Sequence, residues 1–482
     1  MPSIDLKPAP IDFSKYLSKE STGRKRSQLK ELRPYFEIPG MISFGVGIPH
    51  PSTWPVNGMT LSIPFAEKSV FIPGYGSRST SDMLPVEPFS EPLKDEPLRP
   101  DLSSELQYSA TYGTPHLLSW IKEHVQRIHS PQYDEWVNLC TAGNTDGVDG
   151  IMRAVFDRGD YMLVEEFAYP GLLSPAATLG IRTLGVPLDA EGVNPVAMDE
   201  ILSNWNEEER GGPRPKMIVI VPTCSNPAGV TIPAHRKREI YAVCRKWDLL
   251  ICEDDPYCFL QIRPNGADSP IVPSFLSLDT DGRVVRVDSF SKIVAPGSRL
   301  GFITGHKELV EKIMNTRESA TQCPSGFSIA AISAILRAWG SHEGFEKKYI
   351  PYISDIYAKR CLSMIDLLNK YVPSSTIEIP APAGGMFLWV RLKIESHPSF
   401  VNSSTSDPET ISKEVFASMI EEKVLMAPSE FFKAPSLAKW TREEEAKRIY
   451  VRISFSLPPP EEMEEGAKRM GKALAKQWGV EQ

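Results

Sequence analysis

The chain has 482 residues, of which 41% are hydrophobic and 24% charged, a composition typical of a globular protein with material for a large core. Its net charge of −8 argues against a nucleic-acid partner, because phosphate backbones select basic surfaces. No apolar run approaches the roughly 18 residues of a membrane span, so no membrane partner is expected. The cysteines form no Cys-x-x-Cys pair and the histidines no His-Glu-x-x-His pair, which favours a cytoplasmic protein without disulfides or a metal site.

Residues 1–105 are predicted to form an N-terminal segment followed by a proline-rich insertion. A short helix is expected over 27–35, and Gly47, in the run Met41–Pro49, lets the backbone approach another group closely. Repeated prolines between residues 73 and 100 break any regular element in the insertion. We expect the whole segment 1–105 to pack with the C-terminal part of the chain.

From residue 106 the pattern becomes regular, because short apolar runs alternate with helical stretches. Near-continuous apolar strands separated by helices predict a mostly parallel sheet that helices cover on both faces. Residues 106–340 are therefore assigned to a large α/β domain. The expected strands are 137–141, 161–165, 216–221, 249–253, 284–287 and 301–305, and the expected helices include 115–129, 234–247 and 307–319.

The periodicity changes near residue 340, and residues 341–482 are assigned to a smaller α+β domain. A long helix over 345–371 opens it, and a polar, serine-rich loop over 395–407 interrupts it. The remaining expected elements are strands 385–392, 424–427 and 449–455, helix 409–423, and a last helix from residue 460.

Polar side chains follow the predicted strands of the large domain one after another, and in open α/β sheets ligands bind at the carboxyl ends of the strands. Each residue alone has an ordinary explanation, such as a helix cap, a turn, a solvated loop carboxylate or a core tyrosine. Their coincidence at successive strand ends favours one site. In this site hydroxyls and a guanidinium would hold a phosphate, and one amine would remain free to react. They are Asn144 and Thr145, Tyr169, Asn226, Asp254 and Tyr257, and Ser289, Ser291 and Lys292 with Arg299 beyond.

The motifs around these residues carry a family resemblance, which covers the chain from about residue 27 to its end. The sequence resembles the fold-type I pyridoxal-phosphate aminotransferases, and among them the fungal aromatic-amino-acid and the 2-aminoadipate or kynurenine aminotransferases. Asn144-Thr145 departs from the family, in which Ser-Gln is common. The matching motifs are Gln107-Tyr-Ser109, Ala142-Gly-Asn144, Glu166-Phe-Ala-Tyr-Pro170, Asn226-Pro-Ala-Gly229, Glu253-Asp-Asp-Pro-Tyr257, Asp288-Ser-Phe-Ser-Lys-Ile293 and Tyr450-Val-Arg-Ile-Ser-Phe455.

The resemblance implies pyridoxal 5′-phosphate as the cofactor. Lys292 would form a Schiff base with its aldehyde and later move the substrate's Cα proton, and Asp254 would keep the pyridine nitrogen protonated. Tyr257 and Asn226 would contact the ring oxygen, and Tyr169 would stack on the ring. The phosphate would be held by Asn144, Thr145, Ser289, Ser291 and Arg299, and by Tyr108 of the neighbouring subunit in a homodimer with shared active sites.

Arg452 is the candidate for binding the substrate's α-carboxylate, with Asn226 and Gly47 beside it. The alternative is that Arg452 pairs with an internal aspartate or glutamate. The resemblance implies a ping-pong transamination of aromatic amino acids, with 2-aminoadipate or kynurenine as further donors and 2-oxoglutarate as acceptor.

Two other functions stay open from the residues alone. The first is another pyridoxal-phosphate reaction at an amino-acid α-carbon, such as β-elimination or decarboxylation. The second is a transcription regulator with an aminotransferase-like domain, against which the acidic, proline-rich residues before position 110 argue.

Overall fold

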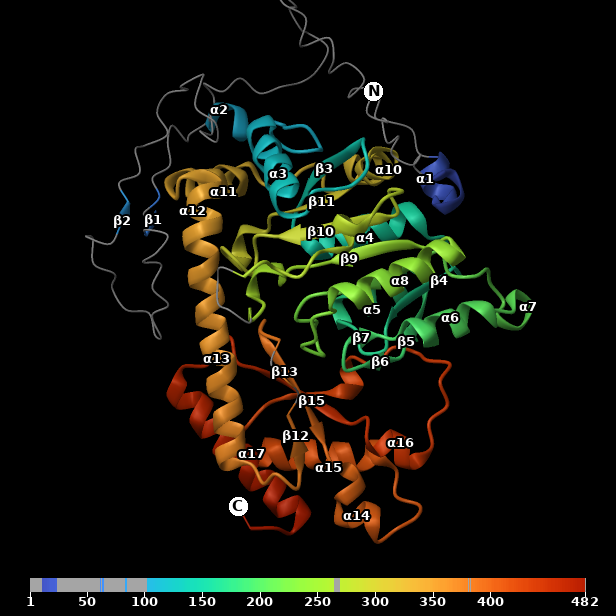
Figure 1. Cartoon of the computed structure of the whole chain (residues 1–482), viewed down its shortest axis with the longest axis vertical. Helices are drawn as coiled ribbons and strands as arrows, with labels where there is room; N and C mark the ends of the chain where they lie inside the picture. The colour runs from blue at the N-terminus through green and yellow to red at the C-terminus, as the bar shows by residue number, and fades with distance from the viewer. Residues whose placement is uncertain are drawn as a thin grey trace, which may run out of the picture.

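The computed structural model describes residues 11–23, 61, 63–64, 83–84, 102–263, 269–379, 381 and 383–481. Two sheets organise this part of the chain, a large one in the upper half of Figure 1 and a small one in the lower half. The long helix α13 (Ile350–Tyr371) runs beside both of them. None of the helices in the described part combines the length and the apolar character that a membrane crossing requires.

The large sheet has seven strands in the order β3-β11-β10-β9-β8-β4-β5. The five strands from β10 to β5 are parallel to one another, whereas β11 runs antiparallel to both of its neighbours. The sheet is therefore mostly parallel, as the sequence predicted. Its strands are β3 (Trp136–Thr141), β4 (Tyr161–Glu165), β5 (Arg182–Val186), β8 (Met217–Ile220), β9 (Leu250–Asp254), β10 (Val284–Ser289) and β11 (Gly301–His306).

Helices cover both faces of this sheet. Successive strand residues point to opposite sides, so each buried strand offers apolar side chains to the helices on both faces. In β8, for example, Ile218 belongs to one buried cluster and Val219 to the other. Helices α4 (Asn144–Val155), α5 (Pro170–Leu179) and α10 (Lys307–Glu318) cover the face of Val219. Helices α3 (Pro115–Ile128), α6 (Pro195–Ser203), α8 (Ala234–Trp247) and α11 (Gly326–Ala338) cover the face of Ile218.

The small sheet has four antiparallel strands in the order β12-β13-β15-β14 and a hydrophobic core of its own. Its strands are β12 (Ile377–Glu378), β13 (Phe387–Leu392), β14 (Ala427–Pro428) and β15 (Tyr450–Ser454). Helices α13, α15 (Pro408–Glu421) and α17 (Pro460–Trp478) pack on it. The fold class predicted from the sequence, a large α/β unit with a smaller α+β unit, is confirmed.

Three details differ from the sequence predictions. The strand expected over 424–427 is present only as the short β14. Strand β5 was not predicted, because Gly185 weakens its strand pattern. Close packing explains the glycine at position 185. Its N–H donates to the carbonyl of Pro435 at 2.7 Å, and a Cβ at this position would lie 3.0 Å from the Cα of Glu166.

The third difference concerns the N-terminal segment, which was expected to pack with the C-terminal domain. Residues 11–23 pack instead on the large sheet's side of the molecule. Phe13 and Tyr16 are buried there, and the ring of Phe13 stacks on His306 at 4.8 Å. The N–H of Ser18 donates to Ala154 at the end of α4 at 2.8 Å. Apart from residues 61, 63–64, 83–84 and 102–105, the rest of the segment 1–105, with the expected helix over 27–35, lies outside the described residues.

Candidate active site

A cavity of about 430 Å³ opens where the carboxyl ends of the large sheet's strands meet the small sheet. Eleven of the side chains singled out from the sequence line one and the same space, although they come from segments up to 308 positions apart (144 to 452). They are Asn144, Thr145, Tyr169, Asn226, Asp254, Tyr257, Ser289, Ser291, Lys292, Arg299 and Arg452. The prediction that the strand ends form one site therefore agrees with the geometry.

Asp254 ends β9 and faces the first turn of α4. Asn144 donates from Nδ2 to Asp254 Oδ1 at 2.6 Å and to the carbonyl of Val287 at 3.1 Å. Burial raises the pKa of Asp254 to about 6, because it disfavours the charged carboxylate, while the bond from Asn144 opposes this change. The side chain of Asn144 thus belongs to the carboxylate end of the cavity. Asn144 could therefore contact a phosphate only through its backbone at the start of α4.

A buried ionic cluster lies directly behind Asp254. Arg286 of β10 is fully buried and lies 3.1 Å from Glu253, 3.1 Å from Asp255 and 2.8 Å from Asp288. Because residues alternate along a strand, Glu253 and Asp255 point to the opposite side of β9 from Asp254. The cluster joins the end of β9 to β10, the two strands that carry Asp254 and Ser289.

Ser289, Ser291 and Arg299 form a polar pocket beside the start of α4. The N–H of Ser291 donates to the Ser289 hydroxyl at 3.0 Å, and Arg299 Nη1 donates to the Ser291 hydroxyl at 3.3 Å. Arg299 Nη2 also donates to the carbonyl of Ala142 at 2.8 Å. Gly143 permits this approach, since a Cβ there would lie 2.6 Å from Arg299 Nη2. Hydroxyls, a guanidinium and a helix N-terminus make a suitable anion site.

Lys292 and Tyr257 supply the groups that can react or move protons. Burial, and after it the charge of Arg299, lowers the pKa of Lys292 below the usual value for lysine. Burial, together with nearby Asp254, raises the pKa of the Tyr257 hydroxyl, so this hydroxyl stays protonated and can donate. Tyr169 lies at the rim and packs over Gly171, where a Cβ would come within 2.3 Å of its ring.

Arg452 reaches the cavity from β15 of the small sheet. It donates from Nη1 to Asn226 Oδ1 at 2.7 Å, and its guanidinium lies over the rings of Phe387 and Phe432 at 4.3 Å and 4.8 Å. Among the described residues no ion pair of Arg452 with a carboxylate is found, the charged or polar groups that act on it being Asn226, Tyr257 and Tyr169, and its buried Nε has no hydrogen-bond partner there. The alternative of an internal acidic partner therefore finds no support in this part of the chain.

Two predicted site residues are not brought into the cavity. Tyr108 does not line it in this single chain, and 68% of its surface is exposed. Gly47 lies outside the described residues.

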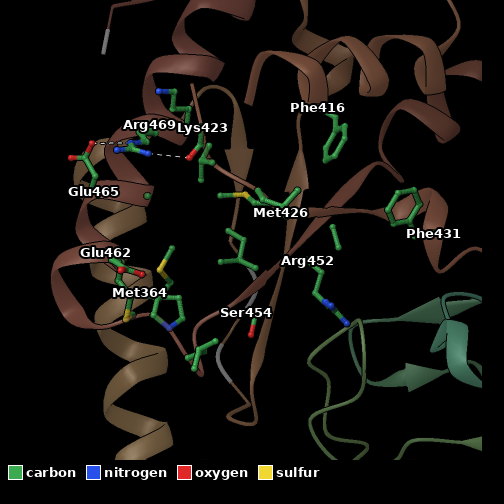
Figure 2. Close-up of a pocket in the computed structure, with 18 residues that line it drawn as sticks. Met364, Phe416, Lys423, Met426, Phe431, Arg452, Ser454, Glu462, Glu465 and Arg469 are labelled. Carbon is green, nitrogen blue, oxygen red and sulfur yellow. Dashed lines mark hydrogen bonds and ion pairs between the residues drawn. The ribbon is translucent and has the colours of Figure 1, made fainter. Parts of the chain in front are cut away.

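A larger hollow of about 770 Å³ lies elsewhere in the small domain, among residues such as Phe416, Met426 and Phe431. Figure 2 shows Arg452 pointing away from this hollow and toward the loops of the large domain. Of the predicted site residues that the structure describes, Arg452 alone also borders this hollow, so we place the chemistry in the smaller cavity.

Pyridoxal phosphate fits the residues of this cavity. An anion pocket at Arg299, a carboxylate at Asp254 and an amine at Lys292 match its phosphate, its ring nitrogen and its aldehyde. The cavity also contains an unused buried acceptor, since Asn144 Oδ1 has no hydrogen-bond partner among the described residues. Fold and site together define an enzyme that uses pyridoxal phosphate.

The chain belongs to the class I and II aminotransferases, because the model of that family matches residues 86–470. It is 34% identical to an aromatic amino acid aminotransferase of Schizosaccharomyces pombe, over 98% of this chain and 97% of the relative. It is 32% identical to the mitochondrial kynurenine/alpha-aminoadipate aminotransferase of Bos taurus, over 96% and 99%. The crystal structure of the aminotransferase Aro8 from Candida albicans matches with a TM-score of 0.87 and 32% identity, over 98% and 100%.

Sequence reasoning missed three contributors to the site. Phe387 and Phe432 flank the Arg452 guanidinium, yet apolar residues on or beside a strand carry no signal that separates them from core residues. Arg286 was also missed, although an arginine inside the apolar run Val284–Val287 could have indicated a buried ionic partner.

Proposed function

We propose that this aminotransferase moves the amino group of aromatic amino acids to 2-oxoglutarate in two half-reactions, with 2-aminoadipate or kynurenine as further donors. The observation that carries the proposal is that Lys292, Asp254 and Arg452 line one cavity. The names of the Schizosaccharomyces pombe and Bos taurus relatives support these classes of donor.

The proposed roles follow from the chemistry of each side chain. Pyridoxal phosphate supplies an aldehyde that accepts the amino group and a ring that withdraws electrons from the substrate's Cα. The Lys292 amine, with its lowered pKa, takes and returns the Cα proton, and Asp254 holds a proton on the ring nitrogen. Tyr257 donates from its hydroxyl to the ring oxygen, with Asn226 beside it, and Tyr169 covers the ring. Ser289, Ser291, Arg299, Thr145 and the N-terminal backbone of α4 hold the phosphate.

A donor panel tests the proposed substrates. With 2-oxoglutarate as acceptor, we expect phenylalanine, tyrosine and tryptophan to give the highest kcat/KM, with activity also on 2-aminoadipate and kynurenine. The assay measures the 2-oxo acid product and glutamate. Ammonia or an amine as the main product would instead indicate elimination or decarboxylation.

Replacing Arg452 is expected to lower kcat/KM for all α-amino acids together. Arg452→Ala removes a charged hydrogen-bond donor, which is worth about 1.5–3 kcal/mol, so kcat/KM should fall about 10- to 100-fold for every donor regardless of side chain. The matched control is Arg391→Ala on the paired strand β13, since Arg391 pairs with Glu378 and Glu395 and lies outside the cavity. A loss confined to dicarboxylic donors would show that Arg452 binds the distal carboxylate.

We propose that the active enzyme is a homodimer in which Tyr108 contacts the phosphate of the neighbouring subunit. The exposure of Tyr108 in one chain supports this arrangement. Tyr108→Phe should weaken cofactor binding about tenfold, the loss of one hydrogen bond to a charged group. The measurement is cofactor titration, with the oligomeric state followed by light scattering. A fully active monomer would contradict the proposal.

Two further assignments complete the proposal. The first is the division of the chain into a segment 1–105, a large cofactor domain 106–340 and a small domain 341–482. The two sheets support the two domains of this division. A cytoplasmic location is supported by the seven cysteines, all of which are free thiols. Because the Bos taurus relative is mitochondrial, fractionation of cells that express the tagged full chain is the test.

A further inference from the structure

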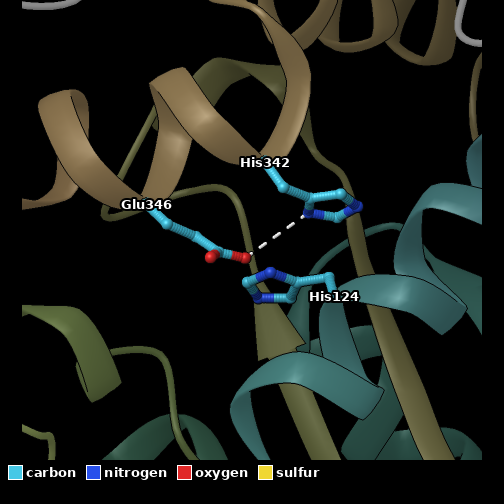
Figure 3. Close-up of side chains that lie close together, drawn as sticks. All are labelled: His124, His342 and Glu346. Atoms are coloured by element: carbon cyan, nitrogen blue, oxygen red, sulfur yellow. Dashed lines mark ion pairs between the residues drawn. The ribbon is translucent and has the colours of Figure 1, made fainter.

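Two histidines and a glutamate converge where α3 meets the turn before α13, outside the cofactor cavity. His124 comes from α3, His342 from α12 (Ser341–Gly344), and Glu346 from the π-helix Phe345–Tyr349 that follows. Figure 3 shows the three side chains close together, with the Glu346 carboxylate directed at the nearer ring nitrogen of His342. One ligand atom from each residue can be chosen so that all three lie within 4.8 Å of one another.

Among the described residues, three of the four imidazole nitrogens of this cluster lack a hydrogen-bond partner, although each nitrogen of His342 lies 3.5 Å from a carboxylate oxygen. His124 and His342 are only 4% and 5% exposed, so bulk solvent has little access to these nitrogens. Within the described residues, His124 Nδ1 and both ring nitrogens of His342 make no hydrogen bond. Buried polar atoms are normally satisfied, and an unpartnered imidazole nitrogen is a preferred ligand for a transition metal.

One pair of ligand atoms has the spacing that a metal site requires, whereas the full set lies within the wider limit of 4.8 Å. Tetrahedral bonds of about 2.0–2.2 Å place neighbouring ligand atoms roughly 3.3–3.6 Å apart. His342 Nδ1 lies 3.5 Å from Glu346 Oε1, which is within that range. The indole of Trp120 stacks on both imidazoles, at 5.0 Å from His124 and 4.6 Å from His342, and so restricts how the rings can turn.

The charges around the cluster also favour a cation. Glu346 accepts two hydrogen bonds from Arg127, at 2.8 Å and 2.7 Å, and Glu123 lies 3.5 Å from His342 Nε2. Two carboxylates therefore face one guanidinium and two rings, which leaves an excess of negative charge when the rings are neutral. The side chain of Arg127 is 41% exposed, so it can turn toward solvent and release Glu346.

We propose that His124, His342 and Glu346 bind one divalent transition-metal ion of the Zn²⁺ type. Two nitrogen ligands and one carboxylate suit zinc better than calcium or magnesium, which prefer oxygen ligands. The ion joins α3 to the start of α13, the helix that continues to the small sheet, so its role is structural. The sequence predicted no metal, because ligands at positions 124, 342 and 346 match no local spacing motif.

Zinc titration of the chelator-treated, full-length holoenzyme tests the proposal. We expect one zinc ion per chain, a zinc-dependent rise in Tm, and a visible absorption spectrum of tetrahedral type when Co²⁺ is used as the probe. His342→Gln and Glu346→Gln should each weaken zinc binding at least about tenfold and abolish the rise in Tm. The matched control is His235→Gln, since His235 is an exposed histidine on α8 and should leave the zinc site unchanged.

A fourth variant separates metal binding from a merely structural role of the cluster. Arg127→Gln removes the cation that competes for Glu346, so it should tighten zinc binding, whereas a purely structural salt bridge predicts no gain. Circular dichroism of each variant checks that it has folded. Absence of stoichiometric zinc binding in the wild type, or equal zinc affinity in wild type, His342→Gln and Glu346→Gln, would overturn the proposal.

Discussion

Lys292→Ala is expected to lower kcat by at least about 10⁴-fold with every donor. The variant loses the amine that attaches the cofactor covalently, and it loses the base that moves the Cα proton, a role worth about 10²- to 10⁴-fold alone. Alanine removes only the side chain beyond Cβ, and Lys292 is partly buried at the cavity wall, so the fold should persist. Single-turnover kinetics with tyrosine measure the loss without interference from product release.

The same variant should keep the cofactor bound, which distinguishes a chemical defect from a binding defect. Asp254 and the pocket at Ser289, Ser291 and Arg299 remain intact, so the cofactor should stay with the protein after desalting. Borohydride should fix the cofactor covalently in the wild type but not in Lys292→Ala, as read from the intact mass. Lys359→Ala is the control for the loss of a lysine side chain outside the cavity, because Lys359 is 74% exposed and pairs with Asp355 on α13. Undiminished turnover of Lys292→Ala would refute the assignment.

The sequence could bring Asp254, Ser289 and Lys292 together for a topological reason. Asp254, Ser289 and Lys292 lie within a few residues of strands β9 and β10, and these strands are parallel neighbours in the sheet. Once the strands are recognised, their carboxyl ends must meet at one edge, so local patterns place the side chains. The exact order of the strands could not be derived in the same way. The antiparallel β11 lies between β3 and β10, and only long-range pairing determines that position.

The substrate end and the buried supports depend on contacts between distant segments. Arg452 was identified as a strand arginine that needs a partner, but its packing between Phe387 and Phe432 arises only when β13, β15 and the segment after β14 come together. The bond between Asn144 and Asp254 likewise joins residues 110 positions apart. Asn144 was expected at the phosphate because its motif resembles the phosphate-binding turn of the family, and that motif carries no information on its side-chain partner.

Asp254→Asn is expected to lower kcat about 10²- to 10³-fold, the usual cost of removing one pre-organised electrostatic group from an active site. Asparagine has nearly the same shape as aspartate, and its Oδ1 can still accept from Asn144, so the change removes charge and leaves packing alone. The control is Asp160→Asn, which breaks the pair between Asp160 and Lys216 at 2.9 Å, outside the cavity. A kcat within about tenfold of the wild type would refute the proposed role of Asp254.

The pH dependence of cofactor binding provides an independent measure of this carboxylate. Burial raises the pKa of Asp254 to about 6 in the protein alone, and a protonated ring nitrogen beside Asp254 would favour the carboxylate and lower that pKa. Cofactor binding therefore releases a proton near pH 6, and linkage requires the affinity to fall, by up to about tenfold per pH unit, as the pH drops below about 6. Above about pH 6 this contribution is constant. In Asp254→Asn the carboxylate is absent, whereas the ionisations of the cofactor itself are the same. Equilibrium titration measures the cofactor affinity of both proteins as a function of pH, and the difference between the two profiles is the contribution of Asp254. Parallel profiles for the two proteins would show that Asp254 does not face the ring nitrogen.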